Sequence, residues 1–540
     1  MSTARRRGGR VDARAWKQLS RVGSRALGPI VTAAAMMSAS ACGAWADHLA
    51  CGDQGCGFTR EEWARVRSLA DVTASPAAPD LSNRYLPIAD WTTGDLTPGA
   101  VASPVVQLGW HLYYETRLSG SDSDIDMTGA FAPTSRKLTC GQVGISCATC
   151  HDPVNAGSDV SSVPRHVSIG AGWYDVNSQQ TLNAARFPVL YWNGRTDTLW
   201  AQAAQVMESG VSMNGHRMKT FWVVTSLYRA AYDAVGFAAP LAAEIDALRA
   251  RLGAAGPAFN GASIKAFHDQ YASLTPAEQH VVTAVHVNAA KAIAAYEWLL
   301  SSDGSPFDRF AREGSDSTAL TPAAVRGLKL FIGRASCIDC HATPLFSDGK
   351  FHNIGIPQTG DHVPTLETCE DASCDCSEGG VKPSCLPSGA FGGRQKLLDP
   401  PAAQLFHRGG EFDDSAVAPT PPDPTLPDPR LLGAWRTPSL RDVALTGPYM
   451  HDGSLATLAD VVWHYSEGEG TPTLGTSELA PLALAERDRD DLLAFLQSLT
   501  GVAGPPELIG PPQDLLAPVT SDACAPAAAQ PIGALAPETR

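Results

Sequence analysis

The sequence predicts a mostly α-helical protein with little sheet, two similar units and long irregular insertions. Three observations support this fold class. The pattern C-x-x-C-H occurs twice, at 147–151 and 337–341, so one kind of local site is built twice along the chain. The segments 242–251 and 278–300 are rich in Ala, Leu and Glu, with apolar residues recurring at three and four positions as in amphipathic helices. Forty prolines and a charged content of 18% indicate long irregular connections.

Composition limits the function classes. A chain of 540 residues with 44% hydrophobic content is long enough for two or three domains with cores of their own. The net charge of -15 and the absence of a basic stripe argue against nucleic acid as a partner. A small basic redox protein is a better electrostatic match.

The N-terminus predicts export. Four arginines within the first ten residues are followed by a mostly apolar stretch, 26–37, and then by Ser-Ala-Ser-Ala before Cys42. Lipid attachment at Cys42 and ordinary cleavage near Ala46 both stay open, because Ala39 stands where a larger aliphatic residue is more common. A membrane anchor is disfavoured, since the stretch falls short of about 18 strongly apolar residues. We therefore expect a periplasmic protein, either free or anchored through lipid at Cys42.

Each C-x-x-C-H pentapeptide is the attachment signature of a c-type haem. Two thiols at this spacing reach the two vinyl groups on one porphyrin edge, and the histidine that follows lies beneath the iron as its proximal ligand. A zinc site would need further paired thiols or histidines nearby, and neither pentapeptide has them. The sequence thus predicts two covalent haems. The predicted attachment residues are Cys147, Cys150, His151, Cys337, Cys340 and His341.

The other cysteines fit an oxidising compartment. Apart from the four haem thiols and Cys42, eight cysteines remain, enough for four disulfides whose connectivity the sequence does not give. Metal binding by the cluster between 369 and 385 is disfavoured, because it contains no C-x-x-C. The eight are Cys51, Cys56, Cys140, Cys369, Cys374, Cys376, Cys385 and Cys524.

Two helices of the C-terminal half are predicted from their ends and faces. Thr321-Pro322 reads as an N-cap with proline at the first helical position, and Val325, Leu328 and Phe331 then form a buried stripe before the second pentapeptide. In the segment 487–500, leucines at 492, 493, 496 and 499 share one face.

With both haem motifs placed, further short segments match a family. The chain resembles the bacterial dihaem cytochrome c peroxidases and their MauG-type relatives over roughly 108–500. The matching segments are L-G at 108–109, R-L-S at 117–119, Y-W-N-G-R at 191–195, F-H-N-I-G at 351–355, R-T-P-S-L-R at 436–441 and L-T-G-P-Y-M-H-D-G at 445–453.

The resemblance implies two mostly helical cytochrome c-like domains that face each other, with the haems near the interface. We expect the proline-rich part of the 357–430 insertion to lie outside a core. The predicted parts are a signal or lipoprotein signal at 1–46, a cysteine-bearing linker at 47–104, the first haem domain at 105–236, a helical connector at 237–314, the second haem domain at 315–501 with its Cys/Pro-rich insertion at 357–430, and a disordered tail at 502–540.

The resemblance also assigns two sites between the domains. A tryptophan of the Y-W-N-G-R segment carries electrons between the haems in this family, which implies that role for Trp192; packing is the ordinary role of any one of the 12 tryptophans. The family binds one calcium ion through an asparagine and two carbonyls, matching Asn177, Thr446 and Pro448, and such oxygen ligands suit a hard cation. The asparagine could equally cap a turn.

The distal ligand of the second haem distinguishes the two branches of the family. Peroxidases carry a methionine fourteen residues after the histidine of P-Y-x-H-x-G, and MauG-type enzymes carry a tyrosine; counting from His451 reaches Tyr465. A phenolate favours ferric or more oxidised iron, whereas a thioether favours ferrous iron. The resemblance therefore points to the MauG-type branch with Tyr465 as ligand. His464 as ligand, or Tyr465 as a buried aromatic, remains an alternative.

At the first haem, the family's S-x-G-H segment supplies a removable sixth ligand, but Ala171 stands at the histidine position. We expect a five-coordinate first haem that is open to peroxide; His166 is the alternative ligand. The distal glutamine and glutamate of the family correspond to Gln202 and Ser212, so the general acid-base is missing. Glu208 is the nearest carboxylate in sequence, and we expect it to be an exposed helix residue.

Three hypotheses follow. The first is an oxidoreductase that reduces hydrogen peroxide at the first haem, with electrons that pass through Trp192 from the His341/Tyr465 haem and come from a small cytochrome or cupredoxin. The second is a MauG-type oxidase of a protein or small-molecule substrate. The third is a non-catalytic electron-transfer or sensor protein, favoured by Ser212. The sequence does not give the oligomeric state.

Overall fold

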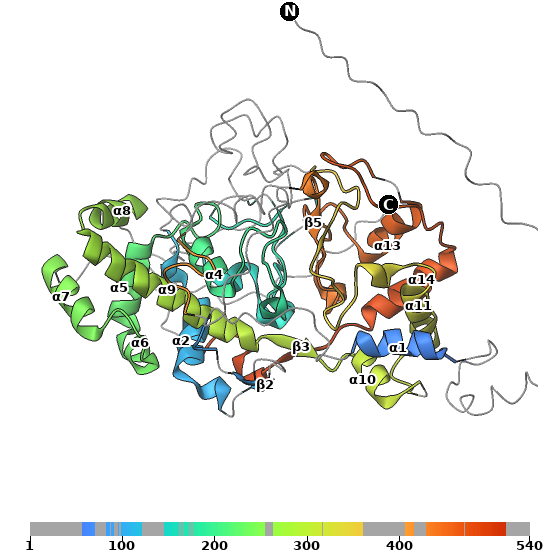
Figure 1. Ribbon diagram of the computed structural model, residues 1–540, viewed down its shortest axis with the longest axis horizontal. Helices are drawn as coiled ribbons and strands as arrows, with labels where there is room; N and C mark the ends of the chain where they lie inside the picture. Colours follow the sequence, from blue (N-terminus) through green and yellow to red (C-terminus); the bar gives the residue numbers. More distant parts are fainter. Residues whose placement is uncertain are drawn as a thin grey trace, which may run out of the picture. The chain divides into compact units, whose positions relative to one another are not determined.

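In the residues that this computed structural model describes, helices make up most of the regular structure and the three sheets are small (Figure 1). The mostly α fold with little sheet is confirmed. The α-helices are α1 (Arg60–Ser68), α2 (Pro104–Tyr113), α3 (Cys147–Cys150), α4 (Leu199–Glu208), α5 (Arg217–Leu227), α6 (Arg229–Val235), α7 (Ala242–Leu252), α8 (Ile264–Ala272), α9 (Pro276–Leu299), α10 (Pro306–Glu313), α11 (Pro322–Ile332), α13 (Leu458–Glu467) and α14 (Glu486–Gln497). The antiparallel strand pairs are β1 (Ile88–Asp90) with β2 (Asp95–Leu96), β3 (Ser301–Asp303) with β6 (Val502–Gly504), and β4 (Phe351–His352) with β5 (Trp435–Arg436).

The structure describes a defined part of the chain, and the elements above all lie in one compact body, Phe58–Arg540. Within this body, we call residues 83–300 the first unit and residues 304–501 the second unit. The described residues are 57–70, 83–120, 145–253, 263–359, 405–414 and 428–514, without 87, 91–94, 97–98, 161, 163, 166, 172–173, 175, 316 and 469. The predicted signal, Cys42, the eight remaining cysteines and His166 lie outside these residues. None of the described helices has the length and hydropathy of a membrane span. The predicted domain boundaries stay predictions.

The helix α9 is the centre of the first unit, and α2, α4 and α5 pack along it (Figure 1). It begins with a capping box, in which the Thr275 hydroxyl accepts from the Glu278 amide and the Glu278 carboxylate accepts from the Thr275 amide. Gly109 of α2 allows the closest approach, because a Cβ there would lie 1.8 Å from the Ala292 carbonyl oxygen. The predicted helix at 278–300 is confirmed.

The second unit is built on the crossing of α11 and α14 (Figure 1). As predicted, Thr321 caps α11, and Val325, Leu328 and Phe331 are buried. Gly327 stands at the crossing, where a Cβ would lie 1.9 Å from a backbone oxygen of α14. Each unit therefore has a glycine at the contact of its two main helices, which places the backbones closer than any other residue permits.

The segment 502–514 corrects one prediction. It was expected to belong to a disordered tail, but β6 pairs with β3 and Leu508 is fully buried. The hydroxyl of Tyr296 donates to the Leu508 carbonyl at 3.0 Å, and the indole of Trp110 donates to the Gly510 carbonyl at 2.8 Å. No local sequence pattern indicates these contacts, because both partners lie far away along the chain.

The segment 405–414 comes from the predicted insertion but packs on the first unit. Phe406 is buried against Trp200, with ring centroids 6.3 Å apart. The carboxylate of Asp414 accepts from the Lys291 ammonium of α9 at 2.9 Å. Residues 405–414 of the predicted insertion therefore pack in the core of the first unit and are not an unpacked linker.

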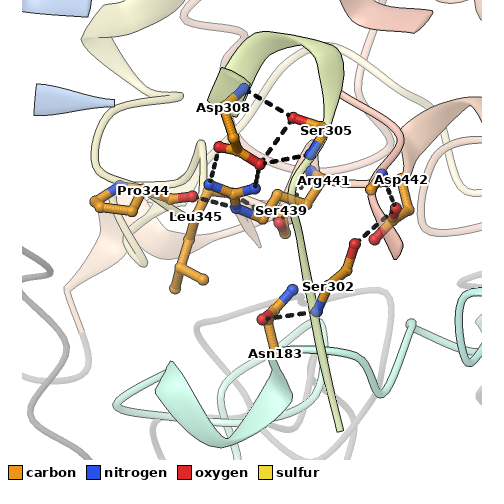
Figure 2. Close-up of polar contacts among 10 residues, drawn as sticks. Asn183, Ser302, Ser305, Asp308, Pro344, Leu345, Ser439, Arg441 and Asp442 are labelled. Atoms are coloured by element: carbon orange, nitrogen blue, oxygen red, sulfur yellow. Dashed lines mark hydrogen bonds and ion pairs between the residues drawn. The ribbon is translucent and has the colours of Figure 1, made fainter. Parts of the chain in front are cut away.

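A polar network joins the units at β3 (Figure 2). The amide of Ser302 donates to Asn183 Oδ1 in the first unit at 3.4 Å, and its hydroxyl donates to Asp442 Oδ1 in the second unit at 2.9 Å. Beside it, Arg441 donates to both carboxylate oxygens of Asp308 at 2.9 and 3.1 Å. These contacts tie β3 to Asn183 of the first unit and to Asp442 of the second.

Candidate active site

The first C-x-x-C-H motif forms α3 and the residue after it. Tyr113 of α2 donates its hydroxyl to the His151 carbonyl at 2.6 Å, which ties the motif to the core. The Nδ1 atom of His151 lies 3.3 Å from the Gly157 carbonyl oxygen. A carbonyl only accepts, so Nδ1 carries the proton and Nε2 is the nitrogen left for a metal.

The second motif repeats this arrangement. His341 Nδ1 lies 2.8 Å from the Phe346 carbonyl oxygen, so here too Nε2 is left for a metal. The loop that follows His341 is held by the R-T-P-S-L-R segment. Ser439 donates its hydroxyl to the Leu345 carbonyl at 2.7 Å, and Arg441 Nε donates to the Pro344 carbonyl at 2.5 Å (Figure 2).

The side chains in both motifs fit haem c. The four thiols at 147, 150, 337 and 340 are partly buried, and none forms a disulfide in the described part of the chain. Burial lowers the pKa of both His151 and His341, which keeps each imidazole neutral, the form that ligates iron. Haem would form two thioether bonds and one axial bond at each motif.

Arg436 offers a further test of the fit, because a buried cation needs an anion. Its side chain is 4% exposed, and Nη1 has no hydrogen-bond partner within the described part of the chain. Its guanidinium lies 3.8 Å from the ring centre of Phe187, and burial lowers its pKa to about 9. A haem propionate is an anion of the required kind. Arg436 lies in the R-T-P-S-L-R segment, but no local sequence pattern singles it out for this role.

Trp192 lies at the contact of the two units. Its indole donates to the Asn177 carbonyl at 2.9 Å in the first unit, and its own carbonyl accepts from the Arg436 amide at 2.7 Å in the second. Its ring meets the edge of His451 at 6.4 Å between centroids. His451 in turn stacks on Trp435, with ring centroids 4.1 Å apart. The rings of Trp192, His451 and Trp435 therefore lie one against the next.

The structure brings the predicted Ala171 loop and Ser212 together. The Ala171 amide donates to the Ser212 carbonyl at 2.8 Å, and the Ser212 hydroxyl donates to Ser209 Oγ at 3.0 Å. The Cys150 sulfur lies 3.7 Å from the Ile169 carbonyl oxygen. The loop therefore spans from the first haem motif to Ser212.

The close approach at Gly170 yields a prediction. A Cβ at this position would lie 2.4 Å from the Ser212 carbonyl oxygen and 2.7 Å from that of Val211. We expect Gly170→Ala to lower the free energy of unfolding by about 1–3 kcal/mol and to change the optical spectrum of the first haem. The added Cβ needs room, so the backbone at 170 or at 211–212 must move. Thermal unfolding and absorption spectra check this. Gly210→Ala is the control, since its Cβ would meet nothing within 4 Å; equal effects of the two variants would contradict the prediction.

Two candidate residues lie on α4, Gln202 and Glu208, and their surroundings differ. Gln202 is half-buried, and its carbonyl accepts from the Tyr191 hydroxyl at 3.4 Å. Glu208 is not the exposed carboxylate that we expected, because Arg217 donates to both of its oxygens at 2.6 and 2.7 Å. Burial alone would raise the pKa of Glu208, but His286 and Arg217 hold it at about 2. Glu208 is thus an ion-pair residue, not a proton donor.

Tyr465 lies on α13 beside the second haem motif. Burial, and then the nearby Cys337 and Cys340 sulfurs, raise the pKa of its phenol above the ordinary value. His464 Nε2 lies 2.9 Å from the Ile354 carbonyl oxygen, so that nitrogen carries a proton. The geometry favours Tyr465 over His464 as a group that faces the haem.

Two of the three predicted calcium ligands meet. Asn177 Nδ2 donates to the Pro448 carbonyl at 3.3 Å, while Asn177 Oδ1 accepts from the Ser162 hydroxyl at 2.8 Å. Both oxygens therefore have hydrogen-bond donors, and the amide nitrogen faces Pro448. Calcium binding through Asn177 and the Thr446 and Pro448 carbonyls stays a prediction.

Comparisons with known proteins identify the class. The family model described as di-haem cytochrome c peroxidase matches residues 103–316. A cytochrome-c peroxidase of Denitromonas iodatirespirans is 29% identical over 405 residues, covering 73% of this chain and 81% of the relative. The methylamine utilization protein MauG of Methylorubrum extorquens is 30% identical over 405 residues, covering 75% of this chain and 79% of the relative. The solved diheme peroxidase BthA of Burkholderia thailandensis has 20% identity and a TM-score of 0.45, covering 75% of this chain and 89% of that chain.

The chain is therefore an oxidoreductase of the dihaem cytochrome c peroxidase and MauG family. Membership of this family implies two haem c groups, as the two pentapeptides predicted.

Proposed function

We propose that this protein reduces hydrogen peroxide at its first haem motif, with electrons that enter at the second motif and pass through Trp192. The position of Trp192 carries the proposal, because it hydrogen-bonds to both units. Haem c, when bound, supplies one-electron redox chemistry and a site for peroxide at an open iron position. The two protons consumed in forming water must come through the protein or from solvent.

The residues around the first motif orient peroxide rather than ligate iron. Ala171 has no ligating atom, and its loop is fixed by the hydrogen bond to Ser212. Gln202 and Ser212 are half-buried polar residues. The side-chain amide of Gln202 would donate a hydrogen bond to peroxide, and the Ser212 hydroxyl, which donates to Ser209 Oγ, would accept one from it. A serine hydroxyl is a poor base at neutral pH, so proton transfer relies on water at this site.

Tyr465 sets the character of the second motif. Its phenol lies in electrostatic range of both thiols of that motif. A phenolate is a hard, anionic ligand, which stabilises more oxidised iron. Electrons would come from a small cytochrome or cupredoxin, and the net charge of -15 would attract a basic one.

Replacing Trp192 tests the relay. We expect Trp192→Phe to slow peroxide-driven oxidation of a reduced cytochrome by about tenfold or more, corresponding to about 1.4 kcal/mol in activation free energy. Stopped-flow absorption of both haems measures the step. The control is Trp63→Phe, because Trp63 packs against Phe58 and Phe310 away from the motifs. An unchanged rate in Trp192→Phe would remove Trp192 from the path.

A MauG-type oxidase is the second candidate, favoured by tyrosine rather than methionine at 465. Such an enzyme would draw electrons from a protein or small-molecule substrate. Oxidation of an aromatic substrate by peroxide, without any reduced cytochrome, would distinguish it from the first candidate.

A further inference from the structure

Glu297 is a buried acid next to the first haem motif that the function above does not use. It lies near the C-terminal end of α9, and it is 5% exposed. Its Oε2 atom has no hydrogen-bond donor within the described ranges. In the sequence it is the one acid in the otherwise mostly apolar run 289–300, which is the signal that could have singled it out.

Aromatic and thiol groups surround Glu297 in the described part of the chain. The titratable groups whose pKa its charge affects are Tyr113 on α2, Tyr296 on α9 and Cys147 on α3. The rings of Tyr113 and Tyr296 meet edge to face at 5.0 Å between centroids. The Tyr113 and Tyr296 hydroxyls donate to the His151 and Leu508 carbonyls. Among the described residues, no cation forms a salt bridge that offsets the burial of this carboxylate.

Burial, and then the nearby Glu297 carboxylate, raise the pKa of the Cys147 thiol, so Glu297 lies beside the first haem motif. The Cys147 sulfur becomes part of the porphyrin through its thioether bond, so a charge that acts on this sulfur also acts on the haem edge. A carboxylate near haem stabilises the ferric state, because that state carries one more positive charge than the ferrous state. Reduction removes this stabilisation and favours the neutral acid.

We propose that Glu297 is a redox-linked proton site: it binds one proton from solvent when the first haem accepts one electron. An O–H bond forms on the carboxylate, no bond breaks except in the hydronium donor, and the electron comes from a one-electron donor protein or a chemical reductant. The proposal rests on haem attachment at Cys147 and not on the peroxide reaction. It can therefore hold or fail independently of the proposed function.

Glu297 can change its protonation state near neutral pH. Burial raises the pKa of Glu297 to about 8, so the carboxyl group titrates within the range of ordinary assays. An ionised Glu297 beside ferric haem would therefore take up a proton when that haem is reduced.

The experiment is a spectroelectrochemical titration of the holoprotein between about pH 6 and pH 10. We expect the midpoint potential of the first haem to fall as pH rises, and this pH dependence to be lost in Glu297→Gln. The second haem, measured in the same sample, serves as the internal control and should give the same curve in both proteins. Glu297→Asp, which keeps a carboxyl group, should retain a pH-dependent potential.

Tyr296→Phe is the matched control for packing, because it removes a neighbouring hydroxyl and leaves the acid in place; we expect its pH dependence to persist. A Glu297→Gln curve that keeps the wild-type slope would overturn the proposal. Should that variant not fold, reduced-minus-oxidised infrared spectra of the wild type decide instead. A carboxylic acid band that appears on reduction and shifts in heavy water supports the proposal, and its absence overturns it.

Discussion

Arg441→Met is expected to lower the free energy of unfolding by about 3–5 kcal/mol. Arg441 and Asp308 have side chains only 6% and 8% exposed, and their two hydrogen bonds join α10 to the R-T-P-S-L-R segment that holds the second haem loop (Figure 2). Methionine fills a similar volume but leaves the Asp308 carboxylate buried without its cation. Loss of one partner of a buried pair costs far more than the pair itself contributes.

Chemical denaturation of the holoprotein at neutral pH measures this effect. Arg430→Met is the matched control, because Arg430 pairs with Asp428 at the surface, where its side chain is 90% exposed. We expect the control to unfold like the wild type, since exposed ion pairs contribute little. Similar unfolding curves for the two variants would contradict the assignment of Arg441 and Asp308 as a buried anchor.

The same pair predicts a pH dependence. Burial alone would raise the pKa of Asp308, but Arg441 and then Ser305 hold it below its usual value. The folded pKa is thus lower than the unfolded one, so the stabilisation is present above the unfolded pKa of about 3.9 and is lost as pH falls through the folded pKa. The difference in the free energy of unfolding between the wild type and Arg441→Met, measured by chemical denaturation, should therefore become smaller as the pH falls.

Ser212→Glu is expected to accelerate the reaction with hydrogen peroxide by about 10²- to 10⁴-fold, the usual contribution of positioned proton transfer. Ser212 is half-buried, and its carbonyl is fixed by the Ala171 amide, so a side chain at this position is held near the first motif. Rates are measured by stopped-flow absorption under excess peroxide.

Ser212→Gln is the control for this substitution, because glutamine has the size of glutamate but no proton to transfer. We expect it to react as slowly as the wild type. If glutamine accelerates the reaction as much as glutamate, the effect is one of packing. If neither variant is faster, proton transfer at this position does not limit the rate.

The features predicted well from the sequence are those that depend on neighbours along the chain. The haem motifs are local because a fixed spacing of two thiols and a histidine sets their chemistry. The start of α11 could be read from Thr321-Pro322, and its buried stripe from the helical period. These signals need no knowledge of distant residues.

The features missed depend on contacts between distant segments. Phe406 reaches the first unit from an insertion in the second, and Leu508 returns to the core from a segment taken as a tail. Glu208 was expected at the surface, but Arg217 follows it after a turn and pairs with it. The burial of Glu297 also depends on packing partners that no local pattern reveals.

The proposed peroxide reaction depends on a first haem that is open to peroxide. A rapid-mixing optical spectrum of the purified diferric protein, with one equivalent of hydrogen peroxide and no reductant, tests this directly. We expect a rapid bleaching and shift of the Soret band, followed by slow return. A spectrum that does not change, even after half-reduction, would contradict it and leave an electron carrier or sensor.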